Sequence, residues 1–337
     1  MPRGPRLDVP GALHHVTVRG ARGARAFRHA ADREDFLARV GALAQEGCWH
    51  VYAWAVLPDH AHLLLRSGSL PLARCMRRLL TGYAGAFNRR REHRGRLFSD
   101  RYKSVVVEEE PYFLELVRYL HLNPLRRRLV RDLAGLAGYP YAGHAALLGQ
   151  VPRPWQDTQA VLSRFGPSPP EARQRYEAFV AAGARQGRRP ELQGGGLLRS
   201  LGGREALQAL RRAGGRYAGD QRILGRSGFV ERLRQASAQH AEAEASRRQP
   251  GVTLDALASR VAALFGVAPQ GIFGPSRARP VAQARQLLTY LWVERLGRRA
   301  SELAAALGRT RGNVSWSARR GAAIAAVRAA DIERWWP

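Results

Sequence analysis

The stretch WAVLPDHAHLLL, residues 54–65, determines how the N-terminal half of this sequence should fold. Two runs of apolar and aromatic residues, 51–56 and 60–66, flank a Leu-Pro-Asp segment. Such runs favour β-strands, and proline followed by aspartate favours a tight turn. We therefore expect a β-hairpin across this segment.

Elements on both sides of the hairpin extend the pattern. Alternating residues predict a strand at 13–19, and a β-branched run predicts another at 104–108. Apolar residues at helical spacing predict three helices, which cover residues 32–44, 70–91 and 111–123. The resulting order predicts an α+β fold with a ferredoxin-like antiparallel sheet and its helices on one face.

The rest of the chain divides differently. We expect a catalytic domain at 1–150, a helical and partly ordered linker region at 151–250 that is rich in proline and glycine, and an all-α domain at 251–337. In the last domain a short helix at 301–307, a turn at Gly308 and a basic helix at 313–320 form a helix-turn-helix pattern.

The charge of the chain points to a polyanionic partner. The 337 residues include 55 Lys and Arg against 27 Asp and Glu, a formal net charge of +28. Both the first 145 residues and the remainder are basic, so the charge is not a tail on a neutral enzyme. Lys103 is the only lysine, a skew that we attribute to coding bias. Basic clusters with interleaved aromatic residues favour DNA contacts, here Arg89, Arg90, Arg101, Tyr102 and Lys103.

Several classes of protein are excluded. The two cysteines cannot form a disulfide scaffold or an all-cysteine zinc site. No apolar run reaches the ~20 residues that a membrane-spanning helix needs. No P-loop is visible, which argues against an ATPase. We expect a cytoplasmic, nucleoid-associated protein.

His60-Ala61-His62 is the sharpest local feature. Residues i and i+2 of a strand share a face, so the two imidazoles can bind one divalent metal ion. Two histidines at a strand edge by chance are an equally simple interpretation. On the helix at 111–123, Tyr119 and Asn123 are four residues apart and share a face. Tyr119 could supply a nucleophile there, or it could be a core residue.

Four ordered segments resemble a known family. HHVTVRG at 14–20, WAVLPDHAHLLL at 54–65, the segment from Asn88 to Ser104 and YLHLNP at 119–124 resemble the REP-associated tyrosine transposases, relatives of the small HUH single-strand transposases. The resemblance implies that His60, His62 and Asn123 bind Mg²⁺ or Mn²⁺ and that Tyr119 is the nucleophile. It implies cleavage of single-stranded or hairpin DNA through a 5′-phosphotyrosine intermediate.

Some residues near these motifs have open roles. Tyr83 and Tyr102 are rival nucleophiles, and we interpret Tyr102 as a DNA contact. Asp59 stands where relatives often carry Asn or Glu, and we expect it to face away from the metal. His121 replaces a more usual apolar or aromatic residue and could add a polar group near the site.

The C-terminal domain resembles the DNA-binding domain of the bacterial replication initiator DnaA. The matching segments are SRARP at 276–280, ARQLLTYL at 284–291 and GRTRGNV at 308–314. The resemblance implies contacts with double-stranded DNA through a basic loop and the turn before the last helix. The residues implied are Arg277, Arg279, Arg285, Arg309, Arg311 and Asn313. The initiator's Asp-His pair is replaced by Thr310-Arg311, so recognition of its own DNA box is not expected.

The sequence therefore predicts a two-domain transposase, a monomer or homodimer, that nicks and joins single-stranded DNA. Two alternatives stay open: a domesticated DNA-binding regulator without catalysis, and an RNA-binding protein. The second lacks the aromatic sheet motif of an RNA-recognition domain.

Overall fold

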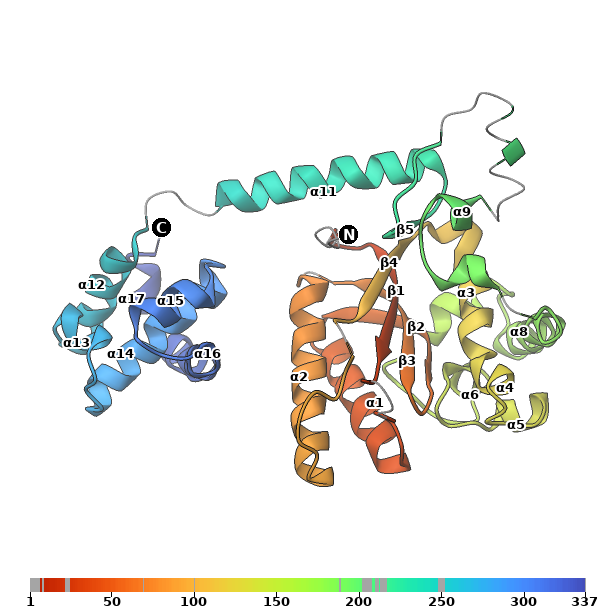
Figure 1. Ribbon diagram of the computed structural model, residues 1–337, viewed down its shortest axis with the longest axis horizontal. Coiled ribbons are helices and arrows are strands. Elements are labelled where there is room, and N and C mark those ends of the chain that lie inside the picture. Colours follow the sequence, from red (N-terminus) through yellow and green to blue (C-terminus); the bar gives the residue numbers. More distant parts are fainter. Residues whose placement is uncertain are drawn as a thin grey trace. The chain divides into compact units, whose positions relative to one another are not determined.

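The computed structural model describes most of the chain (Figure 1). The described residues are 7, 9–21, 25–68, 70–99, 101–187, 189–201, 208–209, 212, 217–247 and 252–336. The chain forms two compact units, residues 1–238 and 239–337. This boundary differs from the domain limits near 150 and 250 that we expected.

The first unit is built on a five-stranded sheet in the order β2-β3-β1-β4-β5. Its strands are β1 (Leu13–Arg19), β2 (Trp49–Val56), β3 (His60–Ser67), β4 (Lys103–Val107) and β5 (Ile223–Leu224). The first four pair antiparallel, and β5 adds to β4 in parallel. The strands at 13–19, 51–56, 60–66 and 104–108 are confirmed to within two residues, and the fold is a mixed α+β fold, as we expected.

The hairpin of β2 and β3 is confirmed. Pro58 and Asp59 form its turn, which the Leu57 N–H closes by donating to the His60 carbonyl at 2.8 Å. A bulge between Val51 and Ala53 shifts the register of β2. Both strands are buried almost throughout because helices cover both faces of the sheet.

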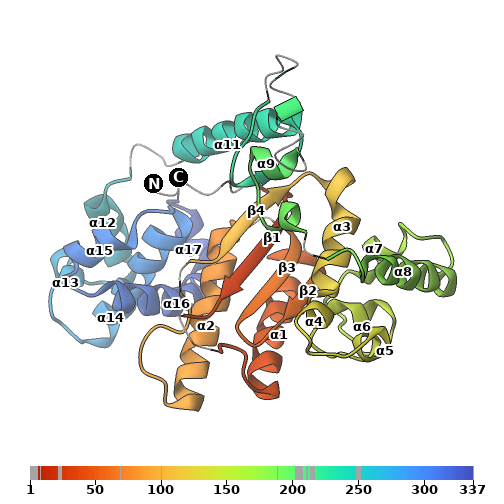
Figure 2. The same cartoon turned by 45° about the vertical axis from the view of Figure 1, so that its right-hand side comes forward.

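The three N-terminal helices are confirmed, but their placement on one face is wrong. They are α1 (Ala30–Gln45), α2 (Leu72–Arg91) and α3 (Glu109–His121). α1 and α2 share a core with Val16, Trp54 and Leu63, whereas α3 packs on the opposite face with Leu64 and Val105 (Figures 1 and 2). Since β2 and β3 are apolar on both faces, a sheet covered by helices on one side alone would leave apolar surface in water.

Residues 151–224 are part of the first unit, where we expected a linker. The helices after α3 are α4 (Asn123–Arg126), α5 (Leu133–Ala137), α6 (Gly143–Leu147), α7 (Thr158–Leu162), α8 (Pro169–Gly183), η1 (Pro190–Gln193), α9 (Leu197–Ser200) and α11 (Ser227–Arg247). The buried Gln156 accepts a hydrogen bond from Trp54 Nε1 at 2.8 Å and donates to the carbonyl of Tyr52 at 3.1 Å. Tyr176 and Val180 of α8 belong to the core beneath α3.

The second unit is all-α. Its helices are α12 (Leu254–Phe265), α13 (Pro269–Phe273), α14 (Arg279–Tyr290), the π-helical turn η2 (Leu291–Arg295), α15 (Ala300–Ala306), α16 (Arg311–Val327) and α17 (Ala329–Glu333). The Thr253 side chain caps α12. Gly308 turns the chain with a φ of 59°, as expected. Leu287, Leu288 and Leu291 are buried in its core. No helix in the described ranges is long and apolar enough to cross a membrane.

Gly321 lets α16 approach α14 closely. A Cβ at this position would lie 2.1 Å from the Gln286 carbonyl oxygen. We expect Gly321→Ala to lower the free energy of unfolding of the second unit by ~1–3 kcal/mol, because the helices must separate. Gly312→Ala is a matched control on the same helix, since its Cβ would meet nothing closer than 3.9 Å. Urea titration of both variants measures the difference, and equal stabilities would contradict the packing argument.

We expect two buried histidines outside the candidate site to make the protein acid-sensitive. His14 contacts Ser104 and His144 contacts Tyr176. Burial lowers the pKa of each from 6.5 to about 4. Between pH 6.5 and pH 4 these histidines bind more protons in the unfolded chain than in the folded one. Their contribution to the free energy of unfolding is therefore complete above pH 6.5 and is lost as the pH falls towards 4.

The expected loss in the free energy of unfolding is on the order of 3 kcal/mol per histidine. Urea unfolding at a series of pH values across this window measures it. His50 is exposed, and His50→Gln should leave the profile unchanged. A profile that is flat through the window would contradict the expectation.

Candidate active site on the α3 face of the sheet

Adjacent strands bring five polar side chains to one face of the sheet. Thr17 of β1 lies opposite His62 of β3, and Arg19 lies opposite His60. His15 shares the face of Thr17 because the two residues are two apart on one strand. His15, His60 and His62 are all at most 8% exposed. An apolar sheet therefore carries a buried histidine cluster at the ends of its central strands.

His62 is held by β1. A hydrogen bond joins its Nδ1 to His15 Nε2 at 3.0 Å, and Thr17 Oγ1 lies 3.2 Å from the same nitrogen. Both contacts involve Nδ1, so Nε2 is the ring atom left for a ligand. The resemblance did not identify His15 or Thr17, although the HHVTVRG segment that contains them was one of its motifs.

His60 is held by its own neighbour in sequence. Its Nδ1 lies 2.7 Å from Asp59 Oδ1. The expectation that Asp59 faces away is wrong: Asp59 is in the turn rather than in the strand, so strand alternation does not govern its side chain. A carboxylate on one imidazole nitrogen orients the ring and makes the other nitrogen a better metal ligand.

Burial favours the neutral form of both histidines. It is the largest cause of the lowered pKa of His60, which the charges of Arg127 and Arg19 lower further and Asp59 opposes. Burial also holds the pKa of His62 well below 6.5, followed by the charges of His15 and His60. A neutral imidazole retains the lone pair that coordinates a metal ion.

Tyr119 lies beside this cluster, and Asn123 follows it by one helical turn. The ring of Tyr119 is 6.4 Å, centroid to centroid, from the rings of both His15 and His62. One turn further on, Asn123 Nδ2 donates to the carbonyls of Tyr119 at 3.1 Å and Leu120 at 3.3 Å. These bonds occupy the amide nitrogen and leave Oδ1 as an acceptor. The structure thus brings Tyr119 together with the histidine cluster, and it fixes the amide of Asn123 on the backbone one helical turn later.

The donor set fits a divalent cation. Two imidazole nitrogens and one amide oxygen are ligands that Mn²⁺ accepts, and Mg²⁺ would complete its shell with water and phosphate oxygens. Within the described ranges, no group of three or more His, Cys, Asp or Glu side chains is placed to hold a metal ion. The ion would therefore depend on these three residues and on its substrate.

Arginines surround the site. The Arg126 guanidinium carbon lies 5.3 Å from the centre of the Tyr119 ring, and its Nη1 donates to the Tyr119 carbonyl at 3.4 Å. Arg126 Nε is buried and has no hydrogen-bond partner among the described residues. Arg19 and Arg127 are exposed and close enough to lower the pKa of His60. Such a field attracts a phosphodiester.

The rival tyrosines and His121 lie elsewhere. Tyr83 is fully buried, its hydroxyl donates to the Ala26 carbonyl, and burial raises its pKa far above 10. Tyr102 is 7% exposed and packs in the core of α1 and α2. His121 is fully buried and contacts the Tyr176 hydroxyl at 2.7 Å, with the His144 ring 6.1 Å away. Our suggestion that His121 serves the site is replaced by this separate buried cluster.

The other DNA-binding residues expected in the first unit have mixed surroundings. Arg89, Arg101 and Lys103 are exposed. Arg90 pairs with Asp32 at 3.0 Å and with Asp35 at 3.3 Å, which partly neutralises it. The burial of Tyr102 does not suit base stacking.

In the second unit, Arg277, Arg279, Arg309 and Asn313 are exposed, whereas the Arg311 side chain lies outside the described residues. Arg285 differs from our expectation of a phosphate contact. It donates to the carbonyls of Ile272 at 2.6 Å, Gly274 at 2.8 Å, Ser276 at 3.1 Å and Gly271 at 3.3 Å. These bonds make it a structural link between α13 and α14.

Comparison with known proteins finds similarity in the part of the chain that carries this site. Residues 11–123 match the family described as Transposase IS200 like. The chain is also similar to a solved structure described as a REP-associated tyrosine transposase bound to a REP hairpin. Identity is 15%, the match covers 44% of this chain and 87% of that one, and the TM-score is 0.37. No curated protein matches the sequence.

The bond between Asp59 and His60 leads to a prediction. Asp59→Asn should weaken Mn²⁺ binding by roughly 10–100-fold, because a neutral amide supports the imidazole less well than a carboxylate does. Isothermal titration with Mn²⁺ measures the change. Asp255→Asn, at an exposed position in the second unit, is the control and should have no effect. Unchanged affinity in Asp59→Asn would show that His60 needs no such support or is not a ligand.

Proposed function

We propose that this protein is a tyrosine transposase of the HUH type that cuts and rejoins single-stranded DNA at hairpin-forming repeats. The observation that carries the proposal is the placement of the Tyr119 ring 6.4 Å from the ring of His62, whose Nδ1 is anchored and which shares a strand face with His60. The family match over residues 11–123 supports it. The strand order β2-β3-β1-β4 with antiparallel pairing supports a ferredoxin-like interpretation of the sheet.

His60, His62 and Asn123 would hold Mg²⁺ or Mn²⁺. With their protons on Nδ1, His60 would donate to Asp59 and His62 would donate to His15, which would leave the Nε2 atom of each ring available to the ion. A bound ion supplies Lewis-acid polarisation of the scissile phosphate. Arg126 and Arg127 add positive charge for the phosphate and for the developing phenolate.

In the proposed reaction the Tyr119 oxygen attacks the phosphorus of a single-stranded phosphodiester. The bond between oxygen and phosphorus forms as the bond to the 3′ oxygen breaks, and the phenol proton passes to solvent. The 3′ oxygen takes up a proton and leaves as a free hydroxyl. The DNA stays linked to Tyr119 through its 5′ phosphate. Attack by a 3′ hydroxyl reverses the step and rejoins a strand without a nucleotide cofactor.

The second unit would bind double-stranded DNA. The short helix α15, the turn at Gly308 and the basic helix α16 support a helix-turn-helix interpretation, with Arg309 and Asn313 exposed. Its resemblance to the DNA-binding domain of DnaA also indicates double-stranded DNA as the partner. We propose that this unit adds duplex affinity and selects the target.

The test is incubation of the protein with end-labelled hairpin DNA and Mg²⁺ or Mn²⁺. We expect a covalent adduct of protein and DNA, a free 3′ hydroxyl on the other fragment, and neither product when EDTA is present. Tight DNA binding with no adduct on any repeat of the source genome would favour the non-catalytic regulator instead.

A further inference from the structure

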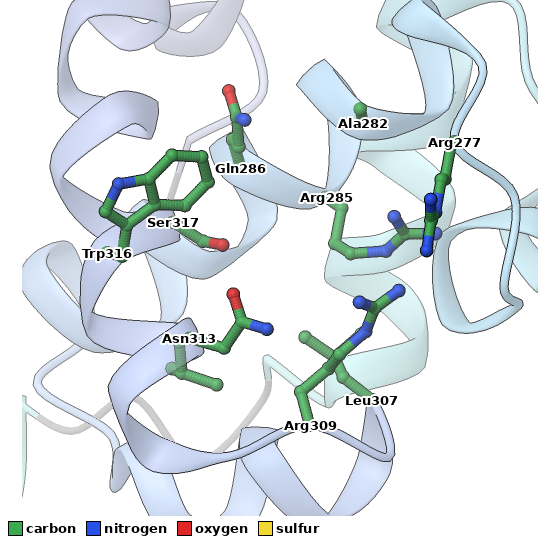
Figure 3. Close-up of a pocket in the computed structure, with 10 residues that line it drawn as sticks. Arg277, Ala282, Arg285, Gln286, Leu307, Arg309, Asn313, Trp316 and Ser317 are labelled. Carbon is green, nitrogen blue, oxygen red and sulfur yellow. The ribbon is translucent and has the colours of Figure 1, made fainter.

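The second unit contains a pocket of about 380 Å³ between α14, α16 and the turn that precedes α16 (Figure 3). Arg285 and Gln286 reach it from α14, Arg309 from the turn, and Asn313 and Trp316 from α16. The pocket lies wholly within residues 277–317, so it belongs to this unit alone. The helix-turn-helix interpretation assigns Arg309 and Asn313 to duplex DNA, but neither it nor the family match to residues 11–123 gives the pocket itself a ligand.

One side of the pocket is aromatic and polar. Trp316 is 52% exposed, and it is the only aromatic side chain among the large exposed apolar residues of the described chain. The Arg320 guanidinium carbon lies 4.9 Å from the Trp316 ring centre. The amides of Gln286 and Asn313 lie on the same side in Figure 3. An amide carries a donor and an acceptor side by side, which matches the edge of a nucleobase.

The opposite side is cationic. Figure 3 shows the guanidinium groups of Arg277, Arg285 and Arg309 gathered there. Arg285 is bound to carbonyls, and its pKa is lowered first by burial and then by the charge of Arg309. No salt bridge within the described ranges involves Arg277 or Arg309, and both side chains are exposed. Gathered like charges with no carboxylate among the lining residues favour an anion between them.

We propose that this pocket binds one unpaired nucleotide of DNA, with its base against Trp316 and its phosphate between Arg277 and Arg309. A nucleotide has the same division as the pocket: a π face and a polar edge at one end, and a phosphate at the other. A base inside a duplex is covered by its neighbours and cannot offer its face, so the ligand is a bulged, flipped or terminal nucleotide. The inference rests on the proposed DNA partner and refines duplex binding to duplex with an unpaired base.

The test uses the full chain carrying Tyr119→Phe, which prevents cleavage. Fluorescence anisotropy at one fixed salt concentration compares a perfect duplex with the same duplex containing one unpaired adenine. We expect the bulged duplex to bind about tenfold more tightly, and Trp316→Leu to remove that preference, since stacking on an aromatic side chain contributes ~1–3 kcal/mol per base. Trp316→Phe, which keeps an aromatic face, should retain most of it.

The arginines have their own control. Arg309→Ala should weaken binding of both duplexes, whereas Arg334→Ala, at an exposed position outside the pocket, should weaken it much less. If Trp316→Leu lost the same affinity for both duplexes, Trp316 would lie in a groove and the proposal would be overturned. Equal binding of the two duplexes by the Tyr119→Phe protein would also overturn it. A bulge preference without covalent adducts in the wild-type chain would sustain this proposal while refuting the tyrosine transposase.

Discussion

Tyr119→Phe is expected to abolish the covalent adduct with single-stranded DNA. The substitution removes only the phenol oxygen, so the ring keeps its contacts with His15, His62 and Arg126. DNA binding should stay within about twofold, while adduct formation should fall by about a thousandfold or more, as when a sole nucleophile is removed. Denaturing gel electrophoresis with labelled DNA measures the adduct, and anisotropy measures binding.

Tyr112→Phe is the matched control for this prediction. Tyr112 lies on the same helix, and its hydroxyl donates to the Ser200 carbonyl at 3.2 Å, away from the histidine cluster. It should form adducts at the wild-type rate. Adducts that persist in Tyr119→Phe would identify another tyrosine, and mass spectrometry of the linked peptide would name it.

His62→Ala is expected to remove metal-dependent cleavage and to weaken Mn²⁺ binding by more than ~100-fold, the upper range for loss of a supporting partner alone. The reason is that His62 supplies one of only two imidazoles in the donor set. The substitution also leaves His15 Nε2 without its partner, so we expect the free energy of unfolding to fall by ~1–3 kcal/mol.

Stability and metal binding must therefore be measured separately. His60→Ala should show the same loss of Mn²⁺ affinity without the effect on His15, since His60 pairs with Asp59 instead. His50→Ala, at an exposed position on β2, should change neither property. Full cleavage by His60→Ala and His62→Ala in the presence of EDTA would refute a metal site on this strand.

Much of the first unit could be predicted from local patterns. The β-strands and the long helices follow from alternation, from helical spacing and from the Leu-Pro-Asp turn, all of which act over a few residues. Tyr119 and Asn123 could be paired because helical spacing alone places them on one face. His60 and His62 could be paired because strand alternation does the same.

The partners of these residues could not be predicted in this way. Thr17 lies opposite His62 only because β1 and β3 pair in one particular register, which depends on the whole sheet. Asp59 contacts His60 because it lies in a turn, where side chains do not have to alternate between the faces of the sheet. Arg285 looked like one more basic residue near a DNA surface, and only the path of residues 271–276 shows that it binds their carbonyls.

The fifth strand sets the limit at which this protein can be shortened. β5 covers the outer edge of β4 through bonds from Val106 N–H to Arg222 O and from Glu108 N–H to Leu224 O, both 2.8 Å. A chain that ends near residue 150 would keep every residue of the family match but expose the hydrogen-bonding groups of β4 to any other extended segment. Such a fragment would be prone to pair edge to edge with its own copies. A catalytic fragment intended to stay monomeric should therefore extend through residue 238.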